Sequence, residues 1–183
     1  MGAQYLERHA YLSASPAWSR TLLVLIGGLA IAGLGLAWVL QHRFDYQPCP
    51  WCVLQRLLVS AVALVAMLGA VARGVWAPVI SSALAAVLSV SGVAVALYQH
   101  QVAAQSASCN LTLADRIIST LGLADFWPAM FEATARCDEA DRPWLGLPFS
   151  LWGAALFVVL GLGALAALRQ SLRWRARVRA SSF

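Results

Sequence analysis

Long apolar segments alternate with shorter polar ones along this chain of 183 residues. Each apolar segment has about the twenty residues that an α-helix needs to cross the hydrocarbon of a bilayer. The pattern predicts an all-α membrane protein, a four-transmembrane-helix bundle that forms a single integral membrane domain over 1–183. The spans are expected at about 21–40, 50–71, 76–98 and 148–168, with polar loops over 41–49 and 99–147 and a tight turn at Arg73-Gly74.

The composition supports a membrane protein. The chain is 61% hydrophobic and 11% charged, whereas a soluble domain has about 25% charged residues. The first apolar run is longer than the roughly 7–15 apolar residues of a secretory signal peptide, and no small-x-small cleavage site follows at Gln41-His42-Arg43. We therefore interpret this run as the first span.

The distribution of charge predicts the orientation of the bundle. All thirteen basic residues are arginine. One side of the predicted bundle, which holds both ends of the chain, has eight arginines against one acidic residue, and the other side has five against seven. Because cytoplasmic segments carry the excess of basic residues, both termini are expected in the cytoplasm and the loops 41–49 and 99–147 outside it. The net charge of +5 thus reflects orientation in a membrane, and no nucleic-acid partner is expected.

Two cysteines separated by two residues stand where the first polar loop meets the second span, in the sequence Pro48-Cys49-Pro50-Trp51-Cys52-Val53-Leu54-Gln55-Arg56. A Cys-x-x-Cys motif indicates redox chemistry or metal binding. Pro50 suits the first helical position because it needs no backbone donor there, which puts Cys49 near the N-cap and Cys52 in the first turn. The free N–H groups and the positive end of the helix dipole favour a thiolate here, and the thiolate is the reactive form in disulfide exchange.

Arg56 lies one turn below Cys52 on the same face of the predicted helix. A charged side chain about one turn into an apolar span is costly, so it indicates a functional site. We expect Arg56 to point into the bundle near Cys52. The alternative is a side chain that extends to the lipid headgroups.

The long loop holds the other two cysteines, Cys109 and Cys137, 28 residues apart. Thr112-Leu113-Ala114-Asp115 has the form of a capping box, apolar residues follow near helical spacing, and Gly122 would end the helix. We predict a short amphipathic helix on the membrane surface, with a small helix packed on the bundle as the alternative. The segment 138–143 is predicted to be mobile and solvated, which would suit a disulfide that meets a partner protein. A purely structural disulfide is the alternative for this cysteine pair.

Four spans, the sequence Cys-Pro-Trp-Cys-Val-Leu-Gln-Arg at the outer end of the second span, and a cysteine pair in a long second outer loop together resemble the DsbB family of bacterial inner-membrane disulfide oxidoreductases. The resemblance covers nearly the whole chain, and the Cys-x-x-Cys motif followed by Gln-Arg is its most specific part. The sequence Trp144-Leu145-Gly146-Leu147-Pro148 ahead of the last span is also similar to the family. Because some members carry Glu where Gln55 stands, no acid–base role is assigned to Gln55.

The resemblance implies a relay of disulfide exchange with four catalytic cysteines. A reduced DsbA-like periplasmic thioredoxin-fold oxidase would attack the loop disulfide and form a mixed disulfide with Cys109. Cys137 would then engage Cys49, and Cys52, freed as a thiolate, would donate electrons to a membrane quinone. In the resting oxidised state the expected pairs are Cys49–Cys52 and Cys109–Cys137.

The resemblance also implies the cofactor and the location. The cofactor would be a quinone from the membrane pool, with ubiquinone favoured over menaquinone, bound by Arg56 and Cys52. The charge of Arg56 would stabilise both the thiolate and a quinone oxygen that gains negative charge. His100, at the outer end of the third span, is a further candidate for the quinone pocket, with an ordinary interfacial histidine as the alternative. The protein is expected in the bacterial inner membrane with its redox site facing the periplasm, and no metal is expected.

Three other interpretations stay open at this point. Vitamin K epoxide reductase has a similar four-helix core, but its Cys-x-x-Cys motif follows the loop pair along the chain, whereas here the motif comes first. Four thiolates on one side of the membrane could bind zinc, although an oxidising compartment argues against this. A membrane scaffold whose disulfides only staple loops is the third.

Overall fold

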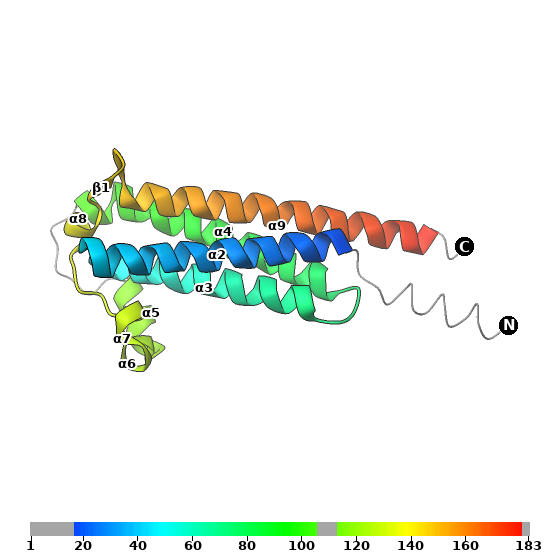
Figure 1. Cartoon of the computed structure of the whole chain (residues 1–183), viewed down its shortest axis with the longest axis horizontal. Helices are drawn as coiled ribbons and strands as arrows, with labels where there is room; N and C mark the ends of the chain where they lie inside the picture. The colour runs from blue at the N-terminus through cyan, green and yellow to red at the C-terminus, as the bar shows by residue number, and fades with distance from the viewer. Residues whose placement is uncertain (1–16, 106–112, 181–183) are drawn as a thin grey trace.

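The computed structural model describes residues 17–105 and 113–180, as four long helices with a group of short elements at one end (Figure 1). Each long helix is long and apolar enough to cross a membrane, which confirms the predicted all-α fold with four spans. The long helices are α2 (Ala17–Phe44), α3 (Pro50–Val71), α4 (Ala77–Gln101) and α9 (Phe149–Ala180). The short elements are η1 (Ala103–Gln105), α5 (Leu113–Thr120), α6 (Leu123–Phe126), α7 (Pro128–Phe131), α8 (Cys137–Ala140), β1 (Pro143–Trp144) and β2 (Leu147–Pro148).

Helix α3 begins and ends at the predicted residues, whereas α2, α4 and α9 extend beyond their apolar runs. The largest extension is in α9, which continues to Ala180 although its apolar run ends near Leu168. The apolar pattern marks the length that can lie in hydrocarbon, but main-chain hydrogen bonding continues for as long as no residue interrupts it. Arg177 and Arg179 lie in the last turn of α9, where cations interact favourably with the helix dipole.

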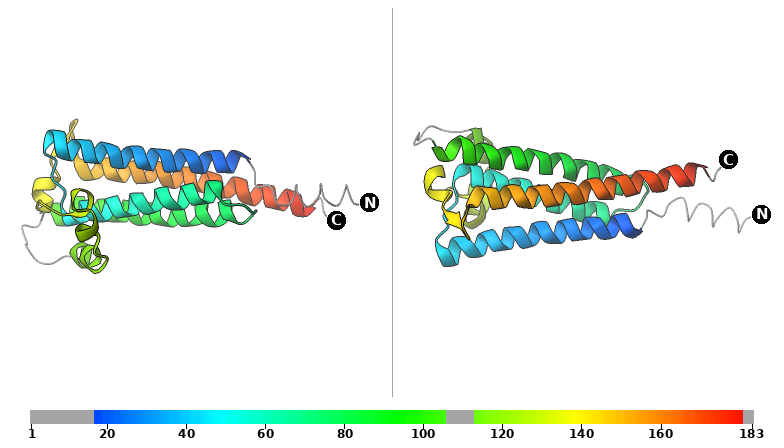
Figure 2. Two further views of the ribbon diagram at one scale, coloured as in Figure 1. Left: turned by 60° about the horizontal axis from the view of Figure 1, so that its bottom comes forward. Right: turned by 90° about the horizontal axis from the view of Figure 1, so that it is seen from above.

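The long helices form a ring in which α2 contacts α3, α3 contacts α4, α4 contacts α9, and α9 returns to α2 (Figure 2). Leu23, Phe157 and Leu160 are fully buried at its centre. Large apolar side chains also cover the outside of the bundle, and Val71 and Val90 are 70% and 68% exposed. An apolar exterior of this kind suits a protein whose surroundings are lipid.

Small residues set the spacing between the helices. A Cβ atom added at Gly92 of α4 would lie 2.2 Å from a ring atom of Phe157 of α9. A Cβ atom at Gly69 of α3 would lie 2.2 Å from the side chain of Ser81 of α4. Close approach through small residues is typical of helices packed in membranes, because van der Waals contact drives their association.

Helix α5 confirms the predicted amphipathic helix, although Thr112 of the expected capping box lies outside the described residues. Ala114 and Ile118 are buried in apolar clusters with residues of α3, so α5 packs on the end of the bundle (Figure 1). Leu113 on the same helix is 63% exposed. The inner face of α5 therefore packs on the bundle, as the alternative prediction had it. Contact of its outer face with a membrane surface stays a prediction.

A β-hairpin joins the long loop to α9. Strands β1 and β2 pair antiparallel, with Trp144 opposite Leu147. Leu145 and Gly146 between them have φ angles of 51° and 85°. Positive φ at both central residues is the geometry of the two-residue turn that best fits the twist of a hairpin. The hairpin turns the chain directly into the first turn of α9.

We expect Gly92→Ala to lower stability, because its Cβ would overlap the buried ring of Phe157 and the two helices would have to separate. Overpacking of this kind costs about 1–3 kcal/mol. Gly35→Ala is the matched control, since nothing lies within 4 Å of a Cβ there. Apparent melting temperatures of the detergent-solubilised variants provide the measurement. Equal melting temperatures for the two variants would contradict the described packing of α4 against α9.

Candidate functional site

The first turn of α3 holds the Cys-x-x-Cys motif as predicted. Cys49 is the N-cap residue and Pro50 begins the helix. The Cys49 Sγ accepts a hydrogen bond from the backbone N–H of Cys52 at 3.3 Å, and the two sulfur atoms are hydrogen bonded as free thiols 3.1 Å apart. Cys49 is fully buried and Cys52 is half-buried. The motif is thus held by the unpaired N–H groups at the start of a helix, which favour sulfur anions.

The long loop brings a third cysteine to this pair. The backbone N–H groups of Thr134 and Ala135 both donate to the carbonyl oxygen of Pro48, at 3.0 and 3.1 Å. Two residues further on, Cys137 packs against Cys49 and hydrogen bonds to it. The two outer loops are therefore joined at the point where their cysteines meet.

The hydrogen bonds among these cysteines divide their chemistry. Hydrogen bonds to Cys137 and to Cys52, together with burial, raise the pKa of Cys49 far above its ordinary value. The pKa of Cys137 is lowered, chiefly because the single hydrogen of the Cys49 thiol can be donated to it in place of Cys52. Cys137 is consequently favoured as an attacking thiolate and Cys49 as a protonated thiol. Cys109, the fourth predicted catalytic cysteine, lies outside the described residues.

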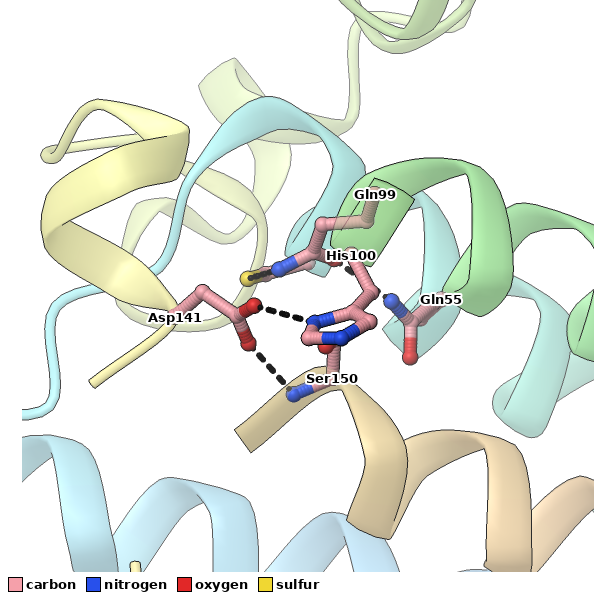
Figure 3. Close-up of polar contacts among 6 residues, drawn as sticks. Gln55, Gln99, His100, Asp141 and Ser150 are labelled. Carbon is pink, nitrogen blue, oxygen red and sulfur yellow. Dashed lines mark hydrogen bonds and ion pairs between the residues drawn. The ribbon is translucent and has the colours of Figure 1, made fainter. Parts of the chain in front are cut away.

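Asp141 anchors the far end of α8, the short helix that begins at Cys137 (Figure 3). One carboxylate oxygen lies 3.0 Å from Nδ1 of His100 on α4, and the other accepts the backbone N–H of Ser150 in the first turn of α9 at 2.8 Å. The Asp141 side chain is only 7% exposed. The prediction of a solvated segment is therefore wrong for Asp141, because the end of α4 and the unpaired N–H groups at the start of α9 supply its partners.

Two glutamines connect Cys52 to the interior of the bundle (Figure 3). Gln99 of α4 is fully buried, and its Nε2 donates to the Sγ of Cys52 at 3.2 Å. Gln55 of α3 donates from its own Nε2 to Oε1 of Gln99 at 2.6 Å. Buried amides are costly unless both ends find partners, and this chain of hydrogen bonds pairs both ends of the Gln99 amide.

A cavity of about 470 Å³ begins at Cys52 and is lined by residues of α2, α3, α4 and α9 as well as the outer loops. Its walls are mostly apolar, and Cys52 and Arg56 are among the polar residues that line it. Leu36 of α2 and Val159 of α9 also line it and are 47% and 54% exposed, so the cavity reaches the outer surface of the bundle. Its size and its mainly apolar lining are typical of a small-molecule site.

The Arg56 guanidinium lies inside the bundle. Arg56 is 6% exposed, and its Nη1 donates to Oε1 of Gln41 at 2.7 Å and to the carbonyl oxygen of Met130 at 3.1 Å. This confirms the expected orientation and excludes the headgroup alternative. Both acceptors are neutral, and none of the ion pairs among the residues in 17–105 and 113–180 includes Arg56. A buried cation without a carboxylate partner suits a site for an anion or for developing negative charge.

The His100 ring pairs with Asp141, and its neighbour Gln99 lines the cavity. Contact of His100 with a quinone stays a prediction. Sequence reasoning missed Gln99 and Asp141 and gave Gln55 no role. Gln55 did carry a signal, since it lies within the predicted span 50–71 and polar side chains within apolar spans indicate functional sites. Gln99 fell in the predicted loop 99–147, so this signal did not apply to it.

These features define a class: a helical membrane protein with four spans, a cluster of cysteines at one end and a cavity that connects one of them to the outside of the bundle. The family model for "Disulfide bond formation protein DsbB" matches residues 19–167. The chain belongs to this family, whose members are membrane proteins that act as disulfide-forming oxidoreductases.

Curated relatives agree with the family assignment. The chain is 36% identical over 150 residues to "Disulfide bond formation protein B" of Dechloromonas aromatica (strain RCB). The matched region covers 77% of this chain and 84% of the relative. It is 31% identical over 145 residues to the protein of the same name from Herminiimonas arsenicoxydans, covering 79% and 91% respectively. The similarity therefore extends over most of both chains.

We expect Asp141→Ala to loosen the segment that carries Cys137, because it removes the links to His100 and Ser150 together. Loss of hydrogen bonds to a charged group costs about 1.5–3 kcal/mol each. Hydrogen exchange of α8 and of the first turn of α9 should therefore become at least about tenfold faster. Asp138→Ala is the matched control on the same helix, since Asp138 pairs with exposed Arg136. Unchanged protection in Asp141→Ala would contradict this anchoring role.

Proposed function

We propose that this protein is a quinone-dependent thiol–disulfide oxidoreductase that reoxidises a DsbA-like dithiol partner and passes the electrons to the membrane quinone pool. The observation that carries the proposal is the position of Cys52. Its sulfur contacts Cys49 on one side, and on the other it lines, together with Arg56, the cavity that reaches the outer surface of the bundle. One residue thus connects thiol exchange to a binding space accessible from lipid.

The relay consists of balanced thiol–disulfide exchanges. A thiolate of the partner attacks the Cys109–Cys137 disulfide at Cys109, and Cys137 leaves as a thiolate. Cys137 then attacks the Cys49–Cys52 disulfide at Cys49, so the Cys49–Cys137 bond forms and Cys52 leaves as a thiolate. The second thiol of the partner resolves the mixed disulfide and releases Cys109 as a thiol. The partner has then lost two electrons and two protons. The electrons are held at Cys52, as a thiolate, and at Cys109, as a thiol; one proton is on Cys109 and the other has passed to water.

The geometry of the described cysteines supports this direction of attack. Cys137 already contacts Cys49, and its lowered pKa favours the thiolate that the second exchange requires. The Cys52 sulfur also lies 3.1 Å from that of Cys49, and it can serve as the leaving sulfur. For the two original disulfides to form again, Cys109 attacks Cys137 and releases Cys49, and Cys49 and Cys52 then form a disulfide as two electrons pass to the acceptor.

The cavity supports a quinone as the acceptor. A bound quinone would take up two electrons and two protons and leave as a quinol, with ubiquinone favoured over menaquinone. Cys52 at one end of the cavity would donate the electrons, and the Arg56 guanidinium would stabilise negative charge on the thiolate and on a ring oxygen. The apolar walls would exclude water from the reacting groups.

The proposed location is the bacterial inner membrane with both termini in the cytoplasm. The four described spans supply the membrane domain, and the excess of arginines on the terminal side supplies the orientation. The cysteines then face the periplasm, where a DsbA-like thioredoxin-fold oxidase is the partner. Such a partner has a reduction potential of about −120 mV, so its electrons need a stronger acceptor than an ordinary protein disulfide.

A reconstituted assay tests the proposed function. Purified protein depleted of quinone is mixed with a reduced DsbA-like thioredoxin-fold dithiol protein, with and without added ubiquinone. We expect catalytic oxidation of the partner only when quinone is present, with one quinone reduced per disulfide formed. Multiple turnovers without quinone, or none with either ubiquinone or menaquinone, would refute the proposal.

We expect Arg56→Met to raise the apparent Michaelis constant for quinone and to slow quinone reduction by about a hundredfold, the usual effect of removing one group that stabilises developing charge. Arg56→Lys should restore activity only partly because lysine lacks the planar donor fork. The exchange between the partner and the loop disulfide should change little, since that disulfide lies in the outer loop. Stopped-flow kinetics separates the two half-reactions, with Arg43→Met at an exposed position as the control. If Arg56→Met reduced quinone at the normal rate, the proposed role of Arg56 in quinone reduction would be refuted.

A further inference from the structure

The Gln99 side chain is the buried group that contacts the reacting sulfur most directly from outside the Cys-x-x-Cys motif (Figure 3). It reaches Cys52 from α4, a different helix, and its Nε2 lies 3.2 Å from the Cys52 Sγ. Gln99 has no exposed surface, so this N–H cannot exchange its partner for solvent. A donor held in this way interacts with the sulfur in every state in which the helices stay packed.

Gln55 determines which end of the Gln99 amide faces the sulfur. Its Nε2 donates to Oε1 of Gln99 at 2.6 Å. Because an amide nitrogen donates and does not accept, this bond holds the oxygen of Gln99 toward Gln55 and leaves the nitrogen toward Cys52. The orientation of the second amide therefore follows from the first.

Gly153 of α9 makes room for Gln55. A Cβ atom added at Gly153 would lie 2.3 Å from Oε1 of Gln55. Any larger residue would push the Gln55 amide out of its present rotamer and disturb its bond to Gln99. Residues from three helices thus form one relay that ends at the Cys52 sulfur.

The contacts of the Cys52 sulfur show when this donor matters. Within the part of the chain that the structure describes, its donors are the Cys49 thiol at 3.1 Å, the Cys49 backbone N–H and the Gln99 amide. Arg56 lines the same cavity, but its guanidinium donates to Gln41 and to Met130. When Cys49 enters a disulfide with Cys137, the Cys49 thiol loses its hydrogen and can no longer donate. Gln99 then remains as the side-chain donor, beside the Cys49 backbone N–H, at the moment when Cys52 carries the negative charge.

We propose that Gln99 is a further catalytic residue, whose amide N–H stabilises the Cys52 thiolate once Cys49 has been oxidised, with Gln55 and Gly153 as the residues that position it. The proposal rests on the proposed function, in that Cys52 acts there as the electron-donating thiolate. A hydrogen bond to the charged form of a group favours that form. Surroundings of low dielectric strengthen the bond.

The test isolates Cys52 in a full-length background that carries Cys49→Ala, Cys109→Ser and Cys137→Ser. This background removes the competing thiol donor, that of Cys49, and leaves Cys52 as the one thiol. Into it are placed Gln99→Glu, which keeps the shape but puts an acceptor against the sulfur, and Gln99→Leu, which removes the amide. Gln101→Glu is the matched control, because it makes the same change on the same helix at an exposed position.

Two measurements on quinone-free protein at neutral pH give the result. We expect both Gln99 variants to lose the ultraviolet absorbance of the thiolate and to be alkylated by iodoacetamide about tenfold or more slowly, the size of effect typical of a hydrogen bond to a charged group. Gln101→Glu should match the background protein. Thiolate absorbance and alkylation rates in the Gln99 variants equal to those of Gln101→Glu would overturn the proposal.

Gly153→Ala provides an independent arm if the Gln99 variants do not fold. It changes neither Cys52 nor Gln99, and it should give a smaller loss of thiolate in the same direction. If Gly153→Ala keeps the full thiolate content of Cys52, the role of Gly153 and Gln55 in positioning Gln99 is refuted. These outcomes are separate from those of the proposed function, because a protein that fails to reduce quinone with its partner can still show the dependence of Cys52 on Gln99.

Discussion

The start of helix α3 is the constraint on which the rest of the site depends. Cys49 caps the helix and Pro50 begins it, so Cys52 falls in the first turn, with Gln55 and Arg56 next to each other one turn below. Other elements approach this fixed frame. The long loop binds to the carbonyl oxygen of Pro48, α4 supplies a hydrogen-bond donor, and α9 approaches closely through a glycine. If the first turn of α3 began one residue later, the side chains of Cys52, Gln55 and Arg56 would turn by about 100° about the helix axis. They would then point away from the elements that now contact them.

The site has two sides with different chemistry. Cys49 and Cys137 meet where the outer loops join, and in the proposed function they exchange disulfides there. Cys52 and Arg56 face the cavity, which is apolar and connected to the outer surface of the bundle. A protein partner needs access from water and a quinone needs access from lipid. In the proposed function, Cys49 beside Cys137 and Cys52 on the cavity allow electrons to pass between these environments while neither reactant enters the other's space.

The sequence predicted the parts of the structure that depend on neighbouring residues. Apolar length gave four spans, the proline at position 50 gave the start of α3, and helical spacing placed Arg56 on the face of Cys52. The buried contacts of Gln99 with Cys52 and of Asp141 with His100 could not be predicted, because the two residues of each pair lie more than forty positions apart along the chain and meet only when the helices pack. The same reason explains why 138–143 was expected to be solvated. Its charges suggested exposure, and only the fold supplies partners for Asp141.

The closeness of Cys137 and Cys49 is the central claim, and disulfide mapping in a variant that retains only these two cysteines tests it most directly. Cys52→Ser and Cys109→Ser together leave one pair able to react. The protein is treated briefly with diamide in membranes, alkylated and analysed by mass spectrometry without reduction. We expect most molecules to carry an intramolecular Cys49–Cys137 disulfide. Two alkylated thiols in most molecules, or disulfides only between chains, would contradict it.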